Sequence, residues 1–179
     1  MKGMVFTEFF EMVEDVFGDD VLDDIIDDAE LPHDGVYTSV GIYPYSEMTS
    51  LASALAKRTG HELTALIETF GHHLFGRFTA LYPGFFVGVE STYDFLAGID
   101  NHIHVEVKKL YPDAQLPQFD IHRNDQQLEL IYNSQRPFGY LAKGLIQGCI
   151  EHFKEPITIE KVDISDDMTS ARFTLNKSA

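Results

Sequence analysis

The pattern of hydrophobic and polar positions has helical period through the first two-thirds of the chain. Segment 4–17 places apolar side chains near one helical face, and segment 21–29 alternates apolar pairs with acidic pairs at the same period. Three further segments with helical period are 46–60, 61–83 (with a break or bend near Gly71) and 91–110. The last of these predicts one long helix whose apolar stripe runs through Leu96, Ile99, Ile103, Val107 and Leu110.

The last third of the chain changes to period-two alternation. Segments 118–124 and 127–134 alternate around a polar turn at 125–126, which is typical of a hairpin. Helical period returns over 139–155, and two more alternating runs follow it, at 157–164 and 171–176. The sequence therefore predicts an α+β fold, mostly helical at first, then a small antiparallel sheet with one inserted helix.

Length, cysteine count and hydropathy limit the class of protein. The 179 residues fit a single domain, 1–179, which we divide into a helical subregion of about 1–60 and a second subregion of about 61–179. A single cysteine, Cys149, excludes a disulfide framework and a cysteine-cluster metal site, and it fits a cytoplasmic setting. We find neither a signal peptide nor a membrane-spanning run.

The charge is strongly negative, at −16, and no Lys or Arg occurs from Gly3 to Ala56. Such a surface repels nucleic acid and anionic lipid, so neither is expected as a partner. A solvated acidic face is favoured over a surface for a basic protein. The paired aspartates of segment 19–28 lack the alternation and central glycine of a calcium loop.

Two histidines, His102 and His104, lie in the helix predicted over 91–110. Residues two apart on a helix point about 200° away from each other, so the two rings cannot bind one metal ion together. Both flank the apolar stripe, where a histidine is more often structural than a ligand. A single neutral imidazole that faces an apolar cavity has one well-known use, as the proximal ligand of haem iron. The periodicity does not decide between the two.

The motif "YNSQR" occupies 132–136. In an extended segment Tyr132, Ser134 and Arg136 share a face, where two hydroxyls and a guanidinium form a good receptor for carboxylates such as haem propionates. The alternative is a polar strand end that leads into a turn at Pro137. The short pattern alone fits both interpretations.

Together, the histidine-bearing helix and "YNSQR" resemble the H-NOX family, the haem–nitric oxide/oxygen binding domains related to the sensor region of soluble guanylate cyclase. The resemblance covers nearly the whole chain, in the segments "MKGMVFTEFFEMVEDVFG", "YTSVGIYPYSEM", "FGHHLFGRF", "KLYPDAQLPQF" and "GLIQG". It implies that subregion 61–179 holds a buried haem b (iron protoporphyrin IX).

The resemblance also implies which residues contact this haem. Family members place the iron ligand seven residues before the Tyr of a "YP" turn, so Tyr111 points to His104 and leaves His102 on the helix face. By the same matching, Pro117 and Phe78 pack on the macrocycle. The residues that hold the propionates are Tyr132, Ser134 and Arg136.

On the distal side, oxygen-binding members resemble one another in carrying a tyrosine nine residues after the first residue of the signature. That position is Leu141 here, and the adjacent Tyr140 points about 100° away from it on a helix. The other distal positions are Phe9, Leu74 and Leu145, which offer no hydrogen bond. Bound O₂ benefits from a donor more than NO or CO does, so an apolar pocket favours the latter two gases.

The expected function is therefore a ferrous haem sensor for nitric oxide and CO, and not an enzyme. It would signal to a separate protein such as a histidine kinase or a cyclic-dinucleotide enzyme. An enzyme built on Cys149 and His152, three apart on a helix, is disfavoured because no oxyanion loop or third partner is evident. A further alternative is a haem-free or redox-responsive interaction module, whose metal contacts would be among His72, His73 and His122.

Overall fold

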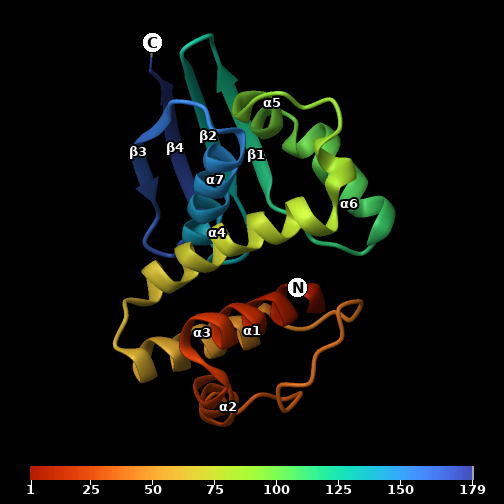
Figure 1. Ribbon diagram of the computed structural model, residues 1–179, viewed down its shortest axis with the longest axis vertical. Coiled ribbons are helices and arrows are strands. Elements are labelled where there is room, and N and C mark those ends of the chain that lie inside the picture. The colour runs from red at the N-terminus through yellow and green to blue at the C-terminus, as the bar shows by residue number, and fades with distance from the viewer. Residues whose placement is uncertain (179) are drawn as a thin grey trace. The chain divides into compact units, whose positions relative to one another are not determined.

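The computed structural model describes residues 1–178. Its contacts divide the chain into two compact units, Met1–Phe70 and Gly71–Ala179, and the division falls within helix α4 (Leu63–Leu81). Helices dominate the first part of the chain, and a four-stranded antiparallel sheet with one inserted helix follows (Figure 1). The predicted α+β fold class is confirmed. No helix within residues 1–178 is long and apolar enough to cross a membrane.

The first unit is built from α1 (Gly3–Phe17), α2 (Asp19–Asp28), α3 (Tyr45–Thr59) and the start of α4. Gly18 separates α1 from α2 with φ +93, a backbone conformation that residues with a side chain rarely adopt. The predicted apolar face of α1 is largely correct, although the fully buried Phe6 also belongs to it. The core side chains of this unit include Phe6, Phe9, Met12, Val13, Leu22, Ile25, Leu51 and Leu55.

The connection between α2 and α3 is fixed by one buried carboxylate, Glu47, which is only 3% exposed. Its two oxygens lie 2.8 Å from His33 Nδ1 and 2.7 Å from the Tyr37 hydroxyl. The Tyr37 ring stacks on Phe6 with 4.2 Å between centroids. Burial and the bond to Glu47 raise the pKa of Tyr37, so its hydroxyl stays protonated and continues to donate.

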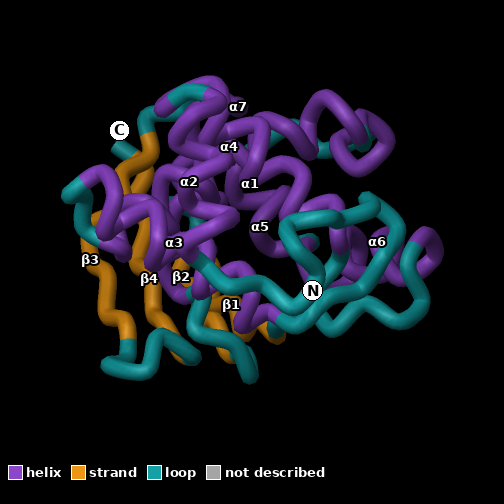
Figure 2. Tube along the Cα trace, turned by 90° about the horizontal axis from the view of Figure 1, so that it is seen from below, coloured by secondary structure: helices purple, strands orange, loops and turns teal. Residues whose placement is uncertain are grey.

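The second unit contains the sheet, whose strand order is β1-β2-β4-β3 (Figures 1 and 2). The strands are β1 (Gln118–Arg123), β2 (Gln127–Asn133), β3 (Ile157–Ile164) and β4 (Ser170–Lys177). Each neighbouring pair is antiparallel, and the hairpin predicted around 125–126 joins β1 to β2. Period-two alternation therefore identified every strand.

One face of this sheet carries the core of the second unit. Alternate side chains of β2 and β4 are buried there, and helix α7 (Gly139–Phe153) packs against them. The buried residues from the strands are Leu128, Leu130, Tyr132, Ala171, Phe173 and Leu175, and those from α7 include Ala142, Ile146, Cys149 and Ile150. The inserted helix, which the change of period predicted, thus covers one face of the sheet.

Helix α4 runs without a break through Gly71, where the sequence predicted a break or bend. The glycine instead allows a close approach, because a Cβ at Gly71 would lie 2.2 Å from the Leu141 carbonyl oxygen of α7. Gly148 of α7 likewise allows a close approach to α4, since a Cβ there would lie 2.8 Å from Phe75 Cβ. The short 3₁₀ helix η1 (Pro83–Phe86) follows α4, in agreement with the stop predicted at Pro83.

The prediction of one long helix over 91–110 is wrong, because the segment forms three consecutive helical pieces. They are α5 (Thr92–Ala97), a π-helical turn η2 (Ile99–Ile103) and α6 (His104–Leu110). In the turn, the Ile103 N–H donates to the carbonyl of Gly98, five residues earlier, at 3.2 Å. Gly98 has low helix propensity, which weakens α-helical pairing at this junction. The predicted apolar stripe is buried at Leu96 but 55% exposed at Leu110.

Candidate functional site

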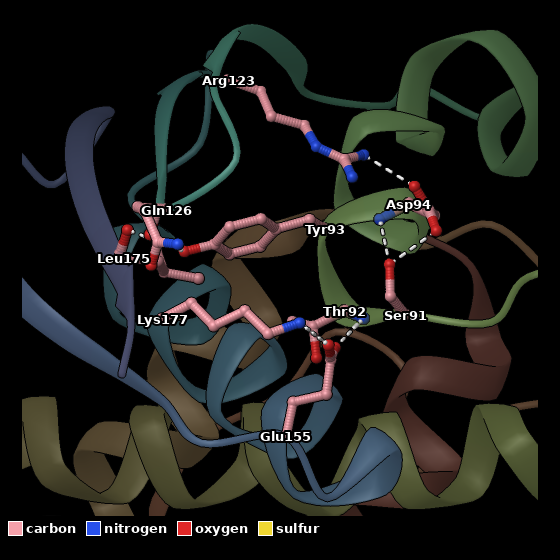
Figure 3. A network of polar contacts seen from close by, with 9 residues as sticks. All are labelled: Ser91, Thr92, Tyr93, Asp94, Arg123, Gln126, Glu155, Leu175 and Lys177. Carbon is pink, nitrogen blue, oxygen red and sulfur yellow. Dashed lines mark hydrogen bonds and ion pairs between the residues drawn. The ribbon is translucent and has the colours of Figure 1, made fainter. Parts of the chain in front are cut away.

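The segment that leads to His104 begins at α5, which a polar network fixes to the sheet (Figure 3). Glu155 accepts from the Thr92 backbone N–H at 2.6 Å and from Lys177 Nζ at 2.7 Å. The Tyr93 hydroxyl lies 3.0 Å from each of two carbonyl oxygens, those of Gln126 and Leu175. The start of α5 is therefore bound to the β1–β2 turn, to β4 and to the connection after α7.

A second set of contacts in the same network caps α5 (Figure 3). Ser91 is the N-cap residue, and its hydroxyl accepts from the Asp94 N–H at 3.1 Å. The Asp94 carboxylate accepts from the Ser91 hydroxyl at 2.6 Å and pairs with Arg123 Nη1 at 2.7 Å. These two partners hold the pKa of Asp94 below its usual range, the Ser91 bond first.

His104 is the first residue of α6 and follows the π-helical turn directly. Its side chain is 16% exposed, and its Nδ1 lies 2.7 Å from an oxygen of Asp100. Burial lowers the pKa of His104 by more than the Asp100 carboxylate raises it, so the ring is neutral at neutral pH. Since Nδ1 donates its proton to Asp100, Nε2 keeps the lone pair that a metal ion needs.

Asp100 holds a second group with its other oxygen. The backbone N–H of Phe119, at the start of β1, donates to it at 2.8 Å. The Phe119 ring lies 5.9 Å from that of His104 and 5.7 Å from that of Tyr132. The carboxylate and this ring thus connect His104 to the first two strands. Sequence reasoning missed Asp100, although an aspartate four residues before a helical histidine is a detectable signal.

The structure brings the signature residues Tyr132, Ser134 and Arg136 together, but through a turn. Strand β2 ends at Asn133, so the shared strand face predicted through residue 136 is wrong. The Ser134 hydroxyl instead accepts from the Arg136 N–H at 3.1 Å. Burial raises the pKa of Tyr132, while a bond with Ser134 and the charge of Arg136 oppose that rise.

The signature residues differ in exposure and in their present partners. Tyr132 is 3% exposed, whereas Ser134 and Arg136 are half-buried. The guanidinium of Arg136 donates to Gln115 Oε1 at 3.1 Å. Two hydroxyls and a guanidinium close together in sequence are suited to an anionic group.

Five of the apolar residues assigned by resemblance lie on α4, on α7 and directly before β1. Leu74 and Phe78 belong to α4, with Leu74 buried and Phe78 half-buried. Pro117 is half-buried directly before β1. Leu141 and Leu145 are half-buried on α7, one turn apart. These side chains carry no hydrogen-bond donor or acceptor.

Phe9 and His102 lie on elements other than these. Phe9 is a core residue of the first unit, 1% exposed, and its ring meets that of Phe70 edge-on at 5.1 Å. His102 lies in the π-helical turn and is exposed. His102 is exposed whereas His104 is half-buried, which agrees with the prediction that the two rings point apart.

Cys149 and His152 do not form an activated pair. The thiol is fully buried, and burial raises its pKa, so it stays protonated and is a poor nucleophile. His152 is exposed, with its ring 5.1 Å from that of Phe86 and 4.9 Å from that of Phe153. The geometry gives no support to a cysteine-dependent enzyme.

The histidines named for a haem-free metal site are also dispersed. His72 pairs with Glu151 at 2.7 Å across α4 and α7, while His122 is exposed on β1. Within residues 1–178 no group of three or more His, Cys, Asp or Glu side chains is arranged to hold a metal ion. A single neutral imidazole, in a unit that also carries the signature hydroxyls and guanidinium, is instead a donor set that fits haem.

Comparison with known proteins identifies the class. Residues 2–161 match the family model described as Haem-NO-binding. The chain therefore belongs to the Haem-NO-binding, or H-NOX, family of haem gas-binding sensor domains. No curated protein matches the chain at a significant level.

Solved structures of this family match over the full length of the chain. The Fe(II) unliganded H-NOX protein from K. algicida is 40% identical, with 100% of this chain and 97% of that chain covered and a TM-score of 0.94. The H-NOX from Shewanella woodyi in the Fe(II)CO state is 38% identical, with 99% and 95% covered and a TM-score of 0.82. An H-NOX protein from S. oneidensis in the Fe(II)NO state is 26% identical, with 100% of both chains covered and a TM-score of 0.91.

Proposed function

We propose that this protein is a haem-based sensor that binds nitric oxide and CO at a ferrous, five-coordinate haem b, excludes O₂ and signals to a separate effector protein. The observation that carries the proposal is the state of His104. Its Nδ1 is committed to Asp100 at 2.7 Å, which leaves Nε2 as the metal-binding atom of a neutral, half-buried ring. When bound, ferrous haem supplies an iron centre that coordinates diatomic gases.

The signature residues would hold the two propionates. Arg136 would donate to a propionate carboxylate in a charge-assisted bond. The hydroxyls of Tyr132 and Ser134 would donate to the remaining oxygens. Pro117 and Phe78 would pack against the macrocycle.

Ligand selectivity would come from the side chains that line the gas-binding side. Leu74, Leu141 and Leu145 offer no proton to a bound gas. Bound O₂ carries partial negative charge and loses more from the missing donor than NO or CO loses. Relatives solved in the Fe(II)NO and Fe(II)CO states support these two gases as ligands.

Signalling would use the difference in affinity of the gas for two arrangements of the protein. A gas that weakens the bond between iron and His104 favours the arrangement in which the α6 segment is released. The effector would be a protein such as a histidine kinase or a cyclic-dinucleotide enzyme. The acidic helices α1 and α2 are one surface that such a partner would meet.

The test is the absorption spectrum of the purified, dithionite-reduced protein under nitrogen, then with NO, CO and air. We expect one broad Soret band that moves with NO and CO and not with air. His104→Gly should lose the native coordination and regain a haem spectrum with added imidazole, whereas His102→Gly should behave as wild type. A protein that stays colourless after haem supply would exclude the proposal and favour the haem-free module, and unchanged coordination in His104→Gly would exclude His104 as the ligand.

Selectivity is tested separately at Leu141. Leu141→Tyr introduces a donor into the half-buried part of α7, and we expect it to produce a stable oxygen complex. Tyr140→Phe is the matched control, because it removes a neighbouring hydroxyl and should leave gas preference unchanged. If wild type already forms a stable oxy spectrum, or if Tyr140→Phe alters gas preference, the distal assignment is wrong.

A further inference from the structure

Asp100 has a geometry that links the proposed iron ligand to the sheet. One carboxylate oxygen lies 2.7 Å from His104 Nδ1, and the other accepts the Phe119 N–H at 2.8 Å. Because both oxygens are engaged, rotation of the carboxylate would break at least one of the two bonds. Phe119 is itself fixed, since it pairs with Tyr132 in the β1–β2 ladder. Asp100 therefore sets both the position and the orientation of the His104 ring.

The π-helical turn places Asp100 for this task. The turn spans Ile99–Ile103 and widens the backbone, with the N–H groups of Ile103 and His104 donating to the carbonyls of Gly98 and Ile99, five residues earlier. Residues 100 and 104 thus lie one turn apart on the same side. π-Helical turns are rare and occur frequently at functional sites.

We propose that Asp100 is a positioning residue that strengthens the bond between His104 and the haem iron and thereby slows release of His104 when nitric oxide binds. This inference rests on the proposed function, because it takes His104 as the iron ligand. A carboxylate that accepts from Nδ1 fixes the tautomer and makes Nε2 a better electron donor. Breaking the iron bond leaves the lone pair on Nε2 and the proton on Nδ1, so release needs no proton transfer.

The size of the effect is limited by solvent. The Asp100 side chain is 37% exposed, so water competes for its charge and weakens its influence on the ring. Loss of such an outer-sphere partner typically changes metal binding by about 10- to 100-fold. For a carboxylate this exposed we expect the lower end, roughly a tenfold faster breakage of the iron–His104 bond without the Asp100 charge.

The experiment compares wild type with Asp100→Asn, which keeps the shape and removes the charge. We expect the iron–histidine stretching frequency of the reduced protein to fall in Asp100→Asn. We also expect NO-triggered breakage of that bond, followed by the Soret band, to accelerate by about tenfold. Asp120→Asn is the matched control, because Asp120 is an exposed aspartate on β1. It should match wild type in both measurements.

A merely structural role of Asp100 would lower stability and leave the stretching frequency unchanged, and that result would overturn the inference. If Asp100→Asn fails to fold or to bind haem, the inference is tested by NMR of the His104 Nδ1 proton in the CO-bound wild type. A downfield, slowly exchanging resonance supports the carboxylate bond, and its absence contradicts it. Failure of the proposed function would be recognised separately. It would appear as a wild type without a haem spectrum, or as unchanged coordination in His104→Gly, and neither result depends on Asp100→Asn.

Discussion

The two ends of the segment that carries His104 are held in different ways. At its start, α5 buries Thr92, Tyr93, Phe95 and Leu96, and Glu155 binds its first N–H group. At its end, none of the α6 residues, all of which the structure describes, is buried. Val105 is 45% exposed and Leu110 is 55% exposed. The side-chain ion pair within α6 joins Glu106 to Lys109 on the surface, at 2.6 Å.

This difference assigns a mechanical role to each end. An element with many buried contacts opens only at high free energy, whereas an exposed helix with few such contacts opens readily. His104 lies between the two, directly after a π-helical turn. In the proposed function, release of the His104 ring from iron would therefore be absorbed by α6, while α5 keeps its place on the sheet.

Amide hydrogen exchange tests this comparison most directly. We expect the amides of Phe95 and Leu96 to exchange roughly a thousandfold more slowly than those of Val107–Leu110, a difference of about 4 kcal/mol in opening free energy. The measurement is residue-resolved exchange by NMR on the protein as purified. The interior amides of α7, a helix of the same unit, serve as the internal reference for slow exchange. Similar protection at both ends would contradict the comparison.

Matched truncations at the two ends probe packing. Leu96 is 2% exposed and Leu110 is 55% exposed, so the same change to alanine meets opposite environments. Leu96→Ala should lower the free energy of unfolding by about 2–5 kcal/mol, because it leaves a cavity in the core. Leu110→Ala should change it by less than about 0.5 kcal/mol. Chemical denaturation with unchanged m-values measures both, and equal effects would show that α6 packs more firmly than its exposure indicates.

Much of the fold follows from local sequence pattern. The four strands, the β1–β2 hairpin and α7 were predicted because alternation and helical period are local properties of the chain. The division of 91–110 into three pieces was missed, although Gly98 lies at the junction, because the contacts that position the pieces come from elsewhere in the sequence. Thr92 is held by Glu155, 63 residues away, and Asp100 by Phe119, 19 residues away. No window of periodicity contains such contacts.

The candidate site shows the same division between local and distant information. Spacing correctly separated His102 from His104, since it depends only on helix geometry. The carboxylate partner of His104 required the structure, and so did the turn that gathers Ser134 and Arg136 beyond the end of β2. The signature motif was readable as a receptor for anions, but its strand geometry was not correct beyond Asn133.

The smallest expected effect concerns the charges at the two ends. Glu155→Gln should lower the free energy of unfolding by about 1–2 kcal/mol at neutral pH, because the charge-assisted bond from Lys177 becomes a neutral one. Glu106→Gln, in the exposed pair of α6, should change it by less than about 0.5 kcal/mol. Thermal or chemical denaturation of the two variants beside wild type measures the difference.

The pH dependence identifies the cause of the Glu155 effect. Burial raises the pKa of Glu155, but the bonds from Lys177 and Thr92 outweigh it and hold the pKa below its usual range. A carboxyl whose pKa is lower in the folded state contributes stability above its unfolded pKa and loses that contribution as pH falls through the folded pKa. The gap between wild type and Glu155→Gln should therefore close on acidification. A gap that persists at a pH where Glu155 is protonated in both states would assign the loss to packing of the side chain and not to its charge.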